Sequence, residues 1–149
     1  MAHPQTVEEF KALVEKFEAR RGFDDIAVTL GLQPHDVTED SISMTLPLTE
    51  PMAQANGMFS AASLFGAADI TGTFLAMMTY ADRGGFPLAV QSNLNFMSNS
   101  KASPAVATAR ILRGGGSVAV AEVSVADADG KELVHSTFTY VIKDRTLGK

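Results

Sequence analysis

The chain has 149 residues, of which 46% are hydrophobic, and its 17 acidic residues outnumber its 12 basic ones. This length fits one domain over residues 1–149 with enough apolar material for a core, and the acidic balance argues against a nucleic-acid partner because phosphate groups would repel the chain. The absence of cysteine excludes disulfides, zinc–thiolate sites and cysteine nucleophiles, and it suits the reducing cytoplasm, where we expect the protein to reside.

A short amphipathic helix is expected near the N-terminus. Thr6 and Glu9 stand three residues apart, as the two partners of a helix capping box do. Apolar residues then recur at helical spacing until Gly22, a residue type that often ends helices. The residues before this helix lack the basic segment and apolar stretch of a signal peptide, so we expect no secretion signal.

Two strands that form a hairpin are expected next. Apolar and polar residues alternate over residues 26–33 and again over residues 41–47, which is the pattern of strands with one buried face. Turn-forming residues at 34–36 and 39–40 separate the two segments. We therefore expect the two strands to pair antiparallel.

One long apolar helix is expected over residues 58–80, after a loop at 49–57 that is rich in turn residues. At ~1.5 Å per residue this helix would be on the order of 30 Å long. Asp69 is its only charged residue. Because a helix that is apolar all round is a buried helix, this carboxylate must be hydrogen-bonded, charge-paired, protonated or open to a cleft. Asp69 is therefore the first candidate for a catalytic group.

Four further strands are expected, over residues 88–98, 105–113, 118–126 and 133–142. The connections between them are short and contain no crossover helix, so these strands must pair antiparallel. The outline is a helix, two strands, one long buried helix and four strands. This order predicts an α+β domain in which a curved antiparallel sheet wraps around the long central helix.

The outline and the residues around Asp69 resemble the hotdog fold, and in particular its acyl-CoA thioesterases of the phenylacetate-degradation (PaaI-like) type. In that family a loop rich in Asn and Gly leads into the central helix through His-Gly-Gly, and Ala-Asp follows about two turns later. Here Ser60-Ala61-Ala62 replaces His-Gly-Gly, and Ala68-Asp69 stands at the matching separation. The segment 88–97 is similar to the family's strand after the helix.

The resemblance implies a thioester hydrolase that acts on acyl-CoA-type substrates, carried by CoA or by an acyl carrier. Asp69 would act as general base toward water or as nucleophile through a mixed anhydride, and both roles stay open. The backbone N–H of Ala61, at the start of the helix, would stabilise the oxyanion. Gln91 on the neighbouring strand would orient the water, with Ser92 as the weaker candidate because strand alternation points it the other way.

In this family the acid and the oxyanion donor come from different subunits, so the resemblance implies a homodimer or a dimer of dimers. Some members carry a helper serine where this chain has Ala89. Candidate substrate-binding residues lie in the loop before the helix, at its start, on the small-residue stripe beside the acid and on the following strand: Gln54, Asn56, Gly57, Ser60, Ala62, Gly66, Thr73 and Ser92. Small side chains on the stripe predict either a cavity beside the carboxylate or a surface for close packing.

These assignments have alternatives. Asp69 can be a buried acid that is hydrogen-bonded to the backbone or to Thr73, and Ser60 is best explained as the N-cap of the long helix. A non-catalytic hotdog module that binds acyl chains or CoA is the alternative function. An enoyl-thioester hydratase is disfavoured because no histidine lies near the start of the helix.

Other classes of site are not expected. The three histidines have no partners at metal-ligand spacing, so we expect neither a metal nor a cofactor. The triple glycine at 114–116 precedes no helix, which indicates a hairpin turn and not a phosphate-binding loop. Gly66, Asp69 and Gly72 interrupt the apolar run of the long helix, which argues against a membrane span.

Overall fold

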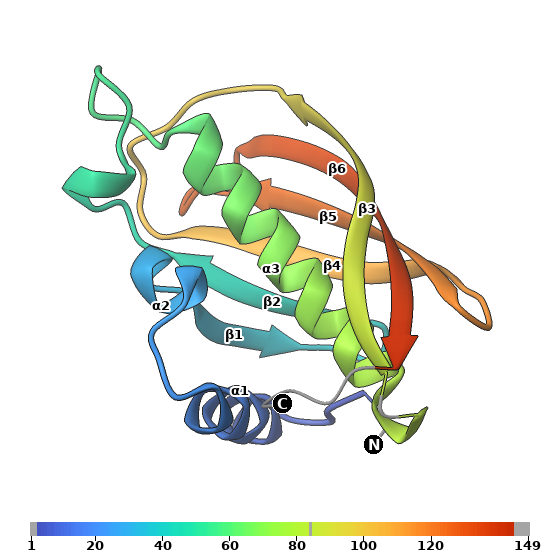
Figure 1. Cartoon of the computed structure of the whole chain (residues 1–149). Helices are drawn as coiled ribbons and strands as arrows, with labels where there is room; N and C mark the ends of the chain where they lie inside the picture. The colour runs from blue at the N-terminus through green and yellow to red at the C-terminus, as the bar shows by residue number, and fades with distance from the viewer. Residues whose placement is uncertain (1–2, 84, 145–149) are drawn as a thin grey trace.

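Six strands form one antiparallel sheet that curves around the long helix α3, as the computed structural model of residues 3–83 and 85–144 shows (Figure 1). The elements in chain order are α1 (Val7–Arg21), α2 (Ile26–Leu30), β1 (Gln33–Val37), β2 (Ser41–Leu46), the 3-10 helix η1 (Glu50–Met52), α3 (Ala61–Thr79), the 3-10 helix η2 (Ala81–Arg83), β3 (Gly85–Phe96), β4 (Ala105–Gly114), β5 (Val118–Ala126) and β6 (Glu132–Asp144). The strand order across the sheet is β1-β2-β4-β5-β6-β3, and every neighbouring pair is antiparallel. The predicted α+β class, with a sheet wrapped around one helix, is confirmed.

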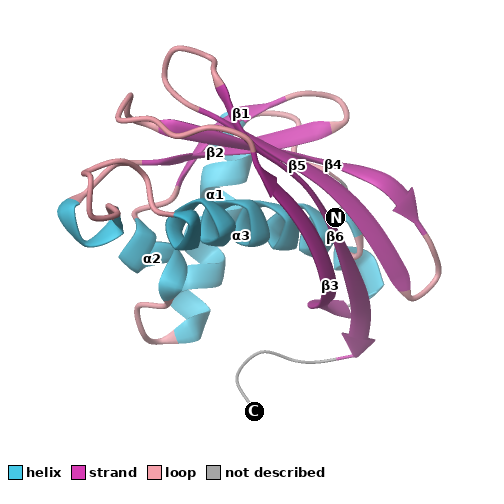
Figure 2. Cartoon of the chain, turned by 90° about the horizontal axis from the view of Figure 1, so that it is seen from above, coloured by secondary structure: helices cyan, strands magenta, loops and turns pink. Residues whose placement is uncertain are grey.

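The helices lie on the concave side of the sheet, which arches over them in Figure 2. Strand alternation turns one set of side chains toward this side. In β5 the fully buried residues are Ala119, Ala121, Val123 and Val125. Helix α3 has the length and the mean hydropathy, 1.3, that would suit a membrane span, but here it packs into the sheet as the core helix.

The N-terminal helix α1 begins and ends where the sequence predicts. The Thr6 hydroxyl accepts a hydrogen bond from the backbone N–H of Glu9 at 3.1 Å, and Gly22 ends the helix in the left-handed conformation with φ 76°. The ring of Phe17 packs edge-on against Phe74 of α3, with the ring centroids 5.5 Å apart. This contact holds α1 beside the C-terminal half of α3.

The strand expected over residues 26–33 is wrong, because its first part forms the short helix α2. The Asp25 carboxylate caps this helix by accepting a hydrogen bond from the Ala27 N–H at 2.8 Å, and Gly31 ends it with φ 74°. Five residues are too few for alternation to be distinguished from helical spacing, so the two caps decide. Strand β1 then includes the turn expected at 34–36, and it still pairs with β2 as a hairpin.

Helix α3 starts at a serine cap. The Ser60 hydroxyl accepts a hydrogen bond from the backbone N–H of Ser63 at 3.1 Å, so the interpretation of Ser60 as an N-cap is confirmed. The helix begins three residues after the predicted start at 58 and ends one residue before the predicted end at 80. The four strands expected after it are present as β3 to β6, with ends that differ by a few residues.

Gly72 allows a close contact between α3 and the sheet. A Cβ atom at this position would lie 2.5 Å from the Tyr140 hydroxyl oxygen and 3.3 Å from Val123 Cγ2. We expect Gly72→Ala to lower the free energy of unfolding by about 1–3 kcal/mol, because Tyr140 would have to move. Urea unfolding followed by circular dichroism measures this change. Gly116→Ala is the matched control, since nothing lies within 4 Å of its Cβ position, and equal midpoints for the two variants would contradict the prediction.

Candidate active site

Asp69 lies midway along α3 and is half-buried. Its Oδ1 atom is buried, and no described residue gives the carboxylate a hydrogen bond. The alternative expectation, a structural hydrogen bond to the backbone or to Thr73, is therefore not met in the described part of the chain. Burial raises the pKa of Asp69 above its ordinary value, because the charged form loses contact with water. The carboxylate is available to a water molecule or a ligand.

An open cavity of about 580 Å³ lies beside Asp69, between α3 and β3. It is lined by Phe65, Asp69, Ala89, Val90, Gln91, Ser92 and Phe138. Phe65 and Phe138 meet edge to face with their ring centroids 5.8 Å apart, and they form an apolar wall. The structure thus places Asp69, Gln91 and Ser92 around one space.

A β-bulge in β3 shifts the alternation so that Ser92 pairs with the buried Phe138, while Gln91 pairs with Thr139 and is exposed. Strand β3 advances by two residues, from Ala89 to Gln91, while β6 advances by one, so Val90 has no partner of its own. The bulge interrupts the alternation that was expected to point Ser92 away. The side-chain amide of Gln91 donates a hydrogen bond to the backbone oxygen of Ser92 at 3.2 Å, which holds it along the strand.

A second hollow, of about 370 Å³, lies at the start of α3, and Gln54, Asn56 and Ala61 are among its lining residues. No hydrogen bond among the described residues uses the backbone N–H of Ala61, whereas that of Ser63 is bound by the Ser60 hydroxyl. Free N–H groups at a helix start point outward at the positive end of the helix dipole. This hollow therefore offers a hydrogen-bond donor to a negatively charged oxygen.

The loop before α3 is held in place from two directions. Within the loop, the Gly57 N–H donates to the backbone oxygen of Gln54 at 2.8 Å, and the Asn56 N–H donates to Gln54 Oε1. Gly57 has φ 77°, a left-handed conformation that favours glycine. From outside the loop, the Ser100 backbone oxygen accepts a hydrogen bond from the Phe59 N–H at 3.1 Å. The loop residues Gln54 and Asn56 are thus presented in one conformation.

Residues 56–134, more than half of the chain, match the sequence model of the thioesterase superfamily. The matched segment contains Ala61, Asp69 and Gln91. The chain belongs to the thioesterase superfamily. None of the curated proteins matches this superfamily member by sequence.

Solved structures share the fold of this thioesterase-superfamily chain at low sequence identity. A thioesterase of Haemophilus influenzae superposes with a TM-score of 0.80 at 17% identity, over 100% of this chain and 98% of the other. The E. coli PaaI protein from the phenylacetic acid degradation operon superposes with a TM-score of 0.73 at 18% identity, over 86% and 91% of the two chains. A mutant thioesterase of Pseudomonas aeruginosa has a TM-score of 0.79 at 16% identity, over 87% and 92%. These similarities confirm the predicted hotdog fold.

Within one chain of this superfamily member, the two halves of the candidate site are far apart. Ala61 and Asp69 are eight residues apart on α3, which separates them by about 12 Å along the helix axis. A hydrogen bond to a carbonyl oxygen and an attack on its carbon both require atoms within about 3–3.5 Å. The N–H of Ala61 and the carboxylate of Asp69 in the same chain therefore cannot act on one carbonyl group.

The small-residue stripe beside Asp69 is partly a packing surface and partly a cavity wall. A Cβ atom at Gly66 would lie 2.7 Å from Leu30 Cδ1, so Leu30 of α2 fills that space. Thr73 lines a smaller cavity, of about 160 Å³, which Asp69 also lines. Ala62 is exposed at the first turn of α3. Of these three predicted substrate-binding residues, Thr73 shares a cavity with the acid.

Tyr140 is a neighbour of the site that the sequence analysis did not single out. Its hydroxyl donates a hydrogen bond to the backbone oxygen of Asp69 at 3.0 Å and so fixes α3 at the acid. Burial raises the pKa of Tyr140 well above its ordinary value, and the nearby charge of Asp69 adds to this shift. Tyr140 therefore stays a neutral donor. Its only signal in the sequence is its inward position in the alternation of the last predicted strand.

Among the residues that the structure describes, no group of three or more His, Asp or Glu side chains has an arrangement that could hold a metal ion. His135, for example, lies 3.3 Å from Glu132 and 3.7 Å from Glu122 in surface ion-pair geometry. The imidazole of His135 thus makes two separate surface contacts, one with each carboxylate.

Proposed function

We propose that the protein hydrolyses acyl-CoA-type thioesters, with Asp69 as general base or nucleophile and the backbone N–H of Ala61 as the oxyanion donor. One observation carries the proposal: a half-buried carboxylate that receives no hydrogen bond from the described residues lies beside a cavity whose volume suits an acyl group. Membership of the thioesterase superfamily supports the class of reaction.

Asp69 can act in two ways. As a base, it would remove a proton from a water molecule, whose oxygen attacks the thioester carbonyl carbon. The N–H at the helix start would stabilise the charge on the carbonyl oxygen. The C–S bond then breaks, and the leaving thiolate takes up the proton, giving an acid and a thiol. As a nucleophile, Asp69 would expel the thiolate itself, and water would hydrolyse the mixed anhydride.

The separation between Ala61 and Asp69 supports a homodimer in which each site takes one residue from each chain. Strand β3 lies at the edge of the sheet, and its outer side pairs with no strand among the described residues. Val90 and Phe96 on this strand are 58% and 49% exposed. Antiparallel pairing of β3 with a second copy would cover the open edge and these apolar side chains. The same two-fold arrangement would bring the partner's helix start toward Asp69.

Gln91 is proposed to orient the attacking water with its side-chain amide. We expect Gln91→Ala to lower kcat about tenfold, because the water loses one hydrogen-bond partner in the transition state. Steady-state kinetics on the best thioester measures this effect. Gln33→Ala is the matched control, since Gln33 is exposed on β1 at the opposite edge of the sheet. A wild-type kcat for Gln91→Ala would leave Ser92 as the remaining candidate.

Release of free thiol from a panel of short, medium, long and aromatic acyl-CoAs tests the proposed function, with acyl-carrier thioesters as a second panel. The chain has no cysteine, so a thiol reagent in the assay reports only the product. We expect cleavage of at least one thioester. If none is cleaved while the same ligands raise the melting temperature, the protein is a non-catalytic module that binds acyl chains or CoA.

A further inference from the structure

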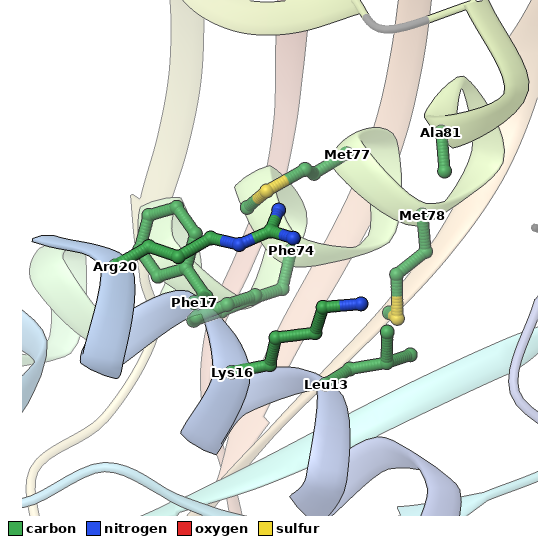
Figure 3. A pocket seen from close by; sticks show the side chains of 8 residues that line it. All are labelled: Leu13, Lys16, Phe17, Arg20, Phe74, Met77, Met78 and Ala81. Carbon is green, nitrogen blue, oxygen red and sulfur yellow. The ribbon is translucent and has the colours of Figure 1, made fainter. Parts of the chain in front are cut away.

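A groove distinct from the catalytic cavity lies between α1 and the C-terminal half of α3 (Figure 3). Its volume is about 370 Å³. Its floor is apolar and includes Phe17, Phe74, Met77 and Met78, and two cationic residues of α1, Lys16 and Arg20, line it as well. We call this site the α1–α3 groove. It combines an apolar surface with positive charge.

The two cations extend over the groove. Figure 3 shows the Lys16 ammonium and the Arg20 guanidinium reaching from α1 toward the methionines of α3. Among the residues that the structure describes, no carboxylate forms an ion pair with either, whereas the adjacent Arg21 is paired with Asp25 at 2.9 Å. In a chain of net charge −5, unpaired cations above an apolar floor match the chemistry of an anionic amphiphile.

A neighbouring cavity lies between the groove and the acid. The cavity of about 160 Å³ that Asp69 lines shares Phe17, Phe74 and Met77 with the groove. Asp69 also lines the catalytic cavity between α3 and β3. The cavity between α3 and β3, the smaller cavity and the groove are therefore neighbours along α3 that share wall residues.

The distance along α3 between the acid and the groove defines a class of ligand. Asp69 and Met77 are eight residues apart on α3, so about 12 Å separates them along the helix axis. An extended chain of single bonds advances by ~1.2 Å per bond, as follows from the ~3.3–3.6 Å that three backbone bonds span. An acyl chain of about ten bonds would thus reach from the acid to the groove.

We propose that the α1–α3 groove is a distal acyl subsite that selects medium-chain acyl groups ending in a carboxylate. This inference rests on the proposed thioester hydrolysis at Asp69. The apolar floor holds the methylene groups, while Lys16 and Arg20 bind the terminal carboxylate. A methyl-ended chain of the same length makes the floor contacts but leaves both cations without a partner. Asp25, which lines the connecting cavity, is neutralised by its ion pair with Arg21 and does not repel the chain.

The test compares two substrates of equal chain length, the CoA monothioester of dodecanedioic acid and dodecanoyl-CoA. We expect the wild type to have the higher kcat/KM for the carboxylate-ended substrate. The double variant Lys16→Gln and Arg20→Gln should lower the ratio of the two kcat/KM values about tenfold, because two charge-assisted hydrogen bonds are lost. Lys11→Gln is the matched control, since Lys11 is exposed on α1 outside the groove.

The outcomes separate the subsite from the proposed function. If thioesters are hydrolysed but the ratio is the same in the wild type and the double variant, the subsite is overturned and the hydrolase function stands. If no thioester is cleaved, the proposed function fails, and calorimetric binding of free dodecanedioic acid then decides on the groove. Tighter binding to the wild type than to the double variant supports the groove as a carboxylate site, and equal or absent binding overturns it.

Discussion

Asp69→Asn is expected to abolish turnover and to raise the melting temperature at neutral pH. An amide neither takes a proton from water nor forms a mixed anhydride, so kcat should fall by about 10²–10⁴-fold. The fold buries Oδ1 and gives the carboxylate no hydrogen bond from the described residues, so the substitution removes a charge that the folded chain does not stabilise. Steady-state kinetics and thermal unfolding by circular dichroism measure the two effects.

The stability effect should depend on pH in one direction. Because burial raises the pKa of Asp69 above its ordinary value of 3.8, the folded state binds a proton more tightly than the unfolded state does. This proton contributes stability that is complete below the unfolded pKa and is lost as the pH rises through the folded pKa. The advantage of Asp69→Asn in melting temperature should therefore grow as the pH rises from the unfolded pKa of Asp69 through its folded pKa. Hydrolysis by the wild type should increase over the same window, because only the ionised acid reacts.

Asp127→Asn is the matched control, because hydrogen bonds stabilise the carboxylate of Asp127, whereas no described residue donates one to Asp69. The Ser100 hydroxyl donates a hydrogen bond to Asp127 Oδ2 at 2.6 Å, and two backbone N–H groups donate to Oδ1. The bond from Ser100, more than the others, lowers the pKa of Asp127, so the stability it contributes is present above the unfolded pKa and lost as the pH falls. Asp127→Asn should lower the melting temperature at neutral pH. Unchanged hydrolysis by Asp69→Asn would remove Asp69 from the mechanism.

Ala61→Pro is expected to lower kcat by about 10²–10³-fold, the cost of removing one oxyanion donor. Proline lacks the backbone N–H but suits the first position of a helix, which Ala61 occupies in α3. The preceding residue, Ser60, has φ −73° and ψ 151°, the extended conformation that a residue before proline prefers. The variant should therefore fold normally, and its circular dichroism spectrum and melting temperature check this. A wild-type rate for Ala61→Pro would exclude the helix start as the oxyanion site.

Mixing the two inactive variants tests whether the site is shared between chains. In a hybrid dimer of Asp69→Asn and Ala61→Pro chains, one of the two sites combines an intact Asp69 with an intact Ala61. Co-expression of differently tagged chains should restore about a quarter of the wild-type activity if dimers form at random. As the control, two differently tagged copies of the same variant are co-expressed, and this dimer should stay inactive. A mixture that remains inactive although hybrid dimers are isolated would contradict the shared site.

Local signals made much of the fold predictable. The Thr6 and Ser60 caps mark helix starts through the chemistry of one side chain, and α3 and the four strands after it are long enough for their periodicity to be clear. Asp69 stood out because a single charge in an apolar helix needs a physical reason. Helix α2 was missed because it has only five residues, and its caps, Asp25 and Gly31, weigh more than its alternation.

The spaces beside α3 could not be predicted in this way. Gly66 and Gly72 look alike in the sequence, yet Leu30 closes the space beside one and Tyr140 the space beside the other. Ser92 reaches the cavity beside Asp69 only because β3 bulges at Val90, an irregularity that depends on pairing with β6.

By itself, the sequence determined that a lone carboxylate lies within a buried central helix wrapped by an antiparallel sheet, since composition, caps and periodicity act over a few neighbouring residues. Only the tertiary structure decided which sides of that carboxylate stay open, how far it lies from the helix start and where Lys16 and Arg20 meet an apolar floor. The physical reason is that open space depends on how side chains distant in sequence fill volume together, and no local pattern records that fit.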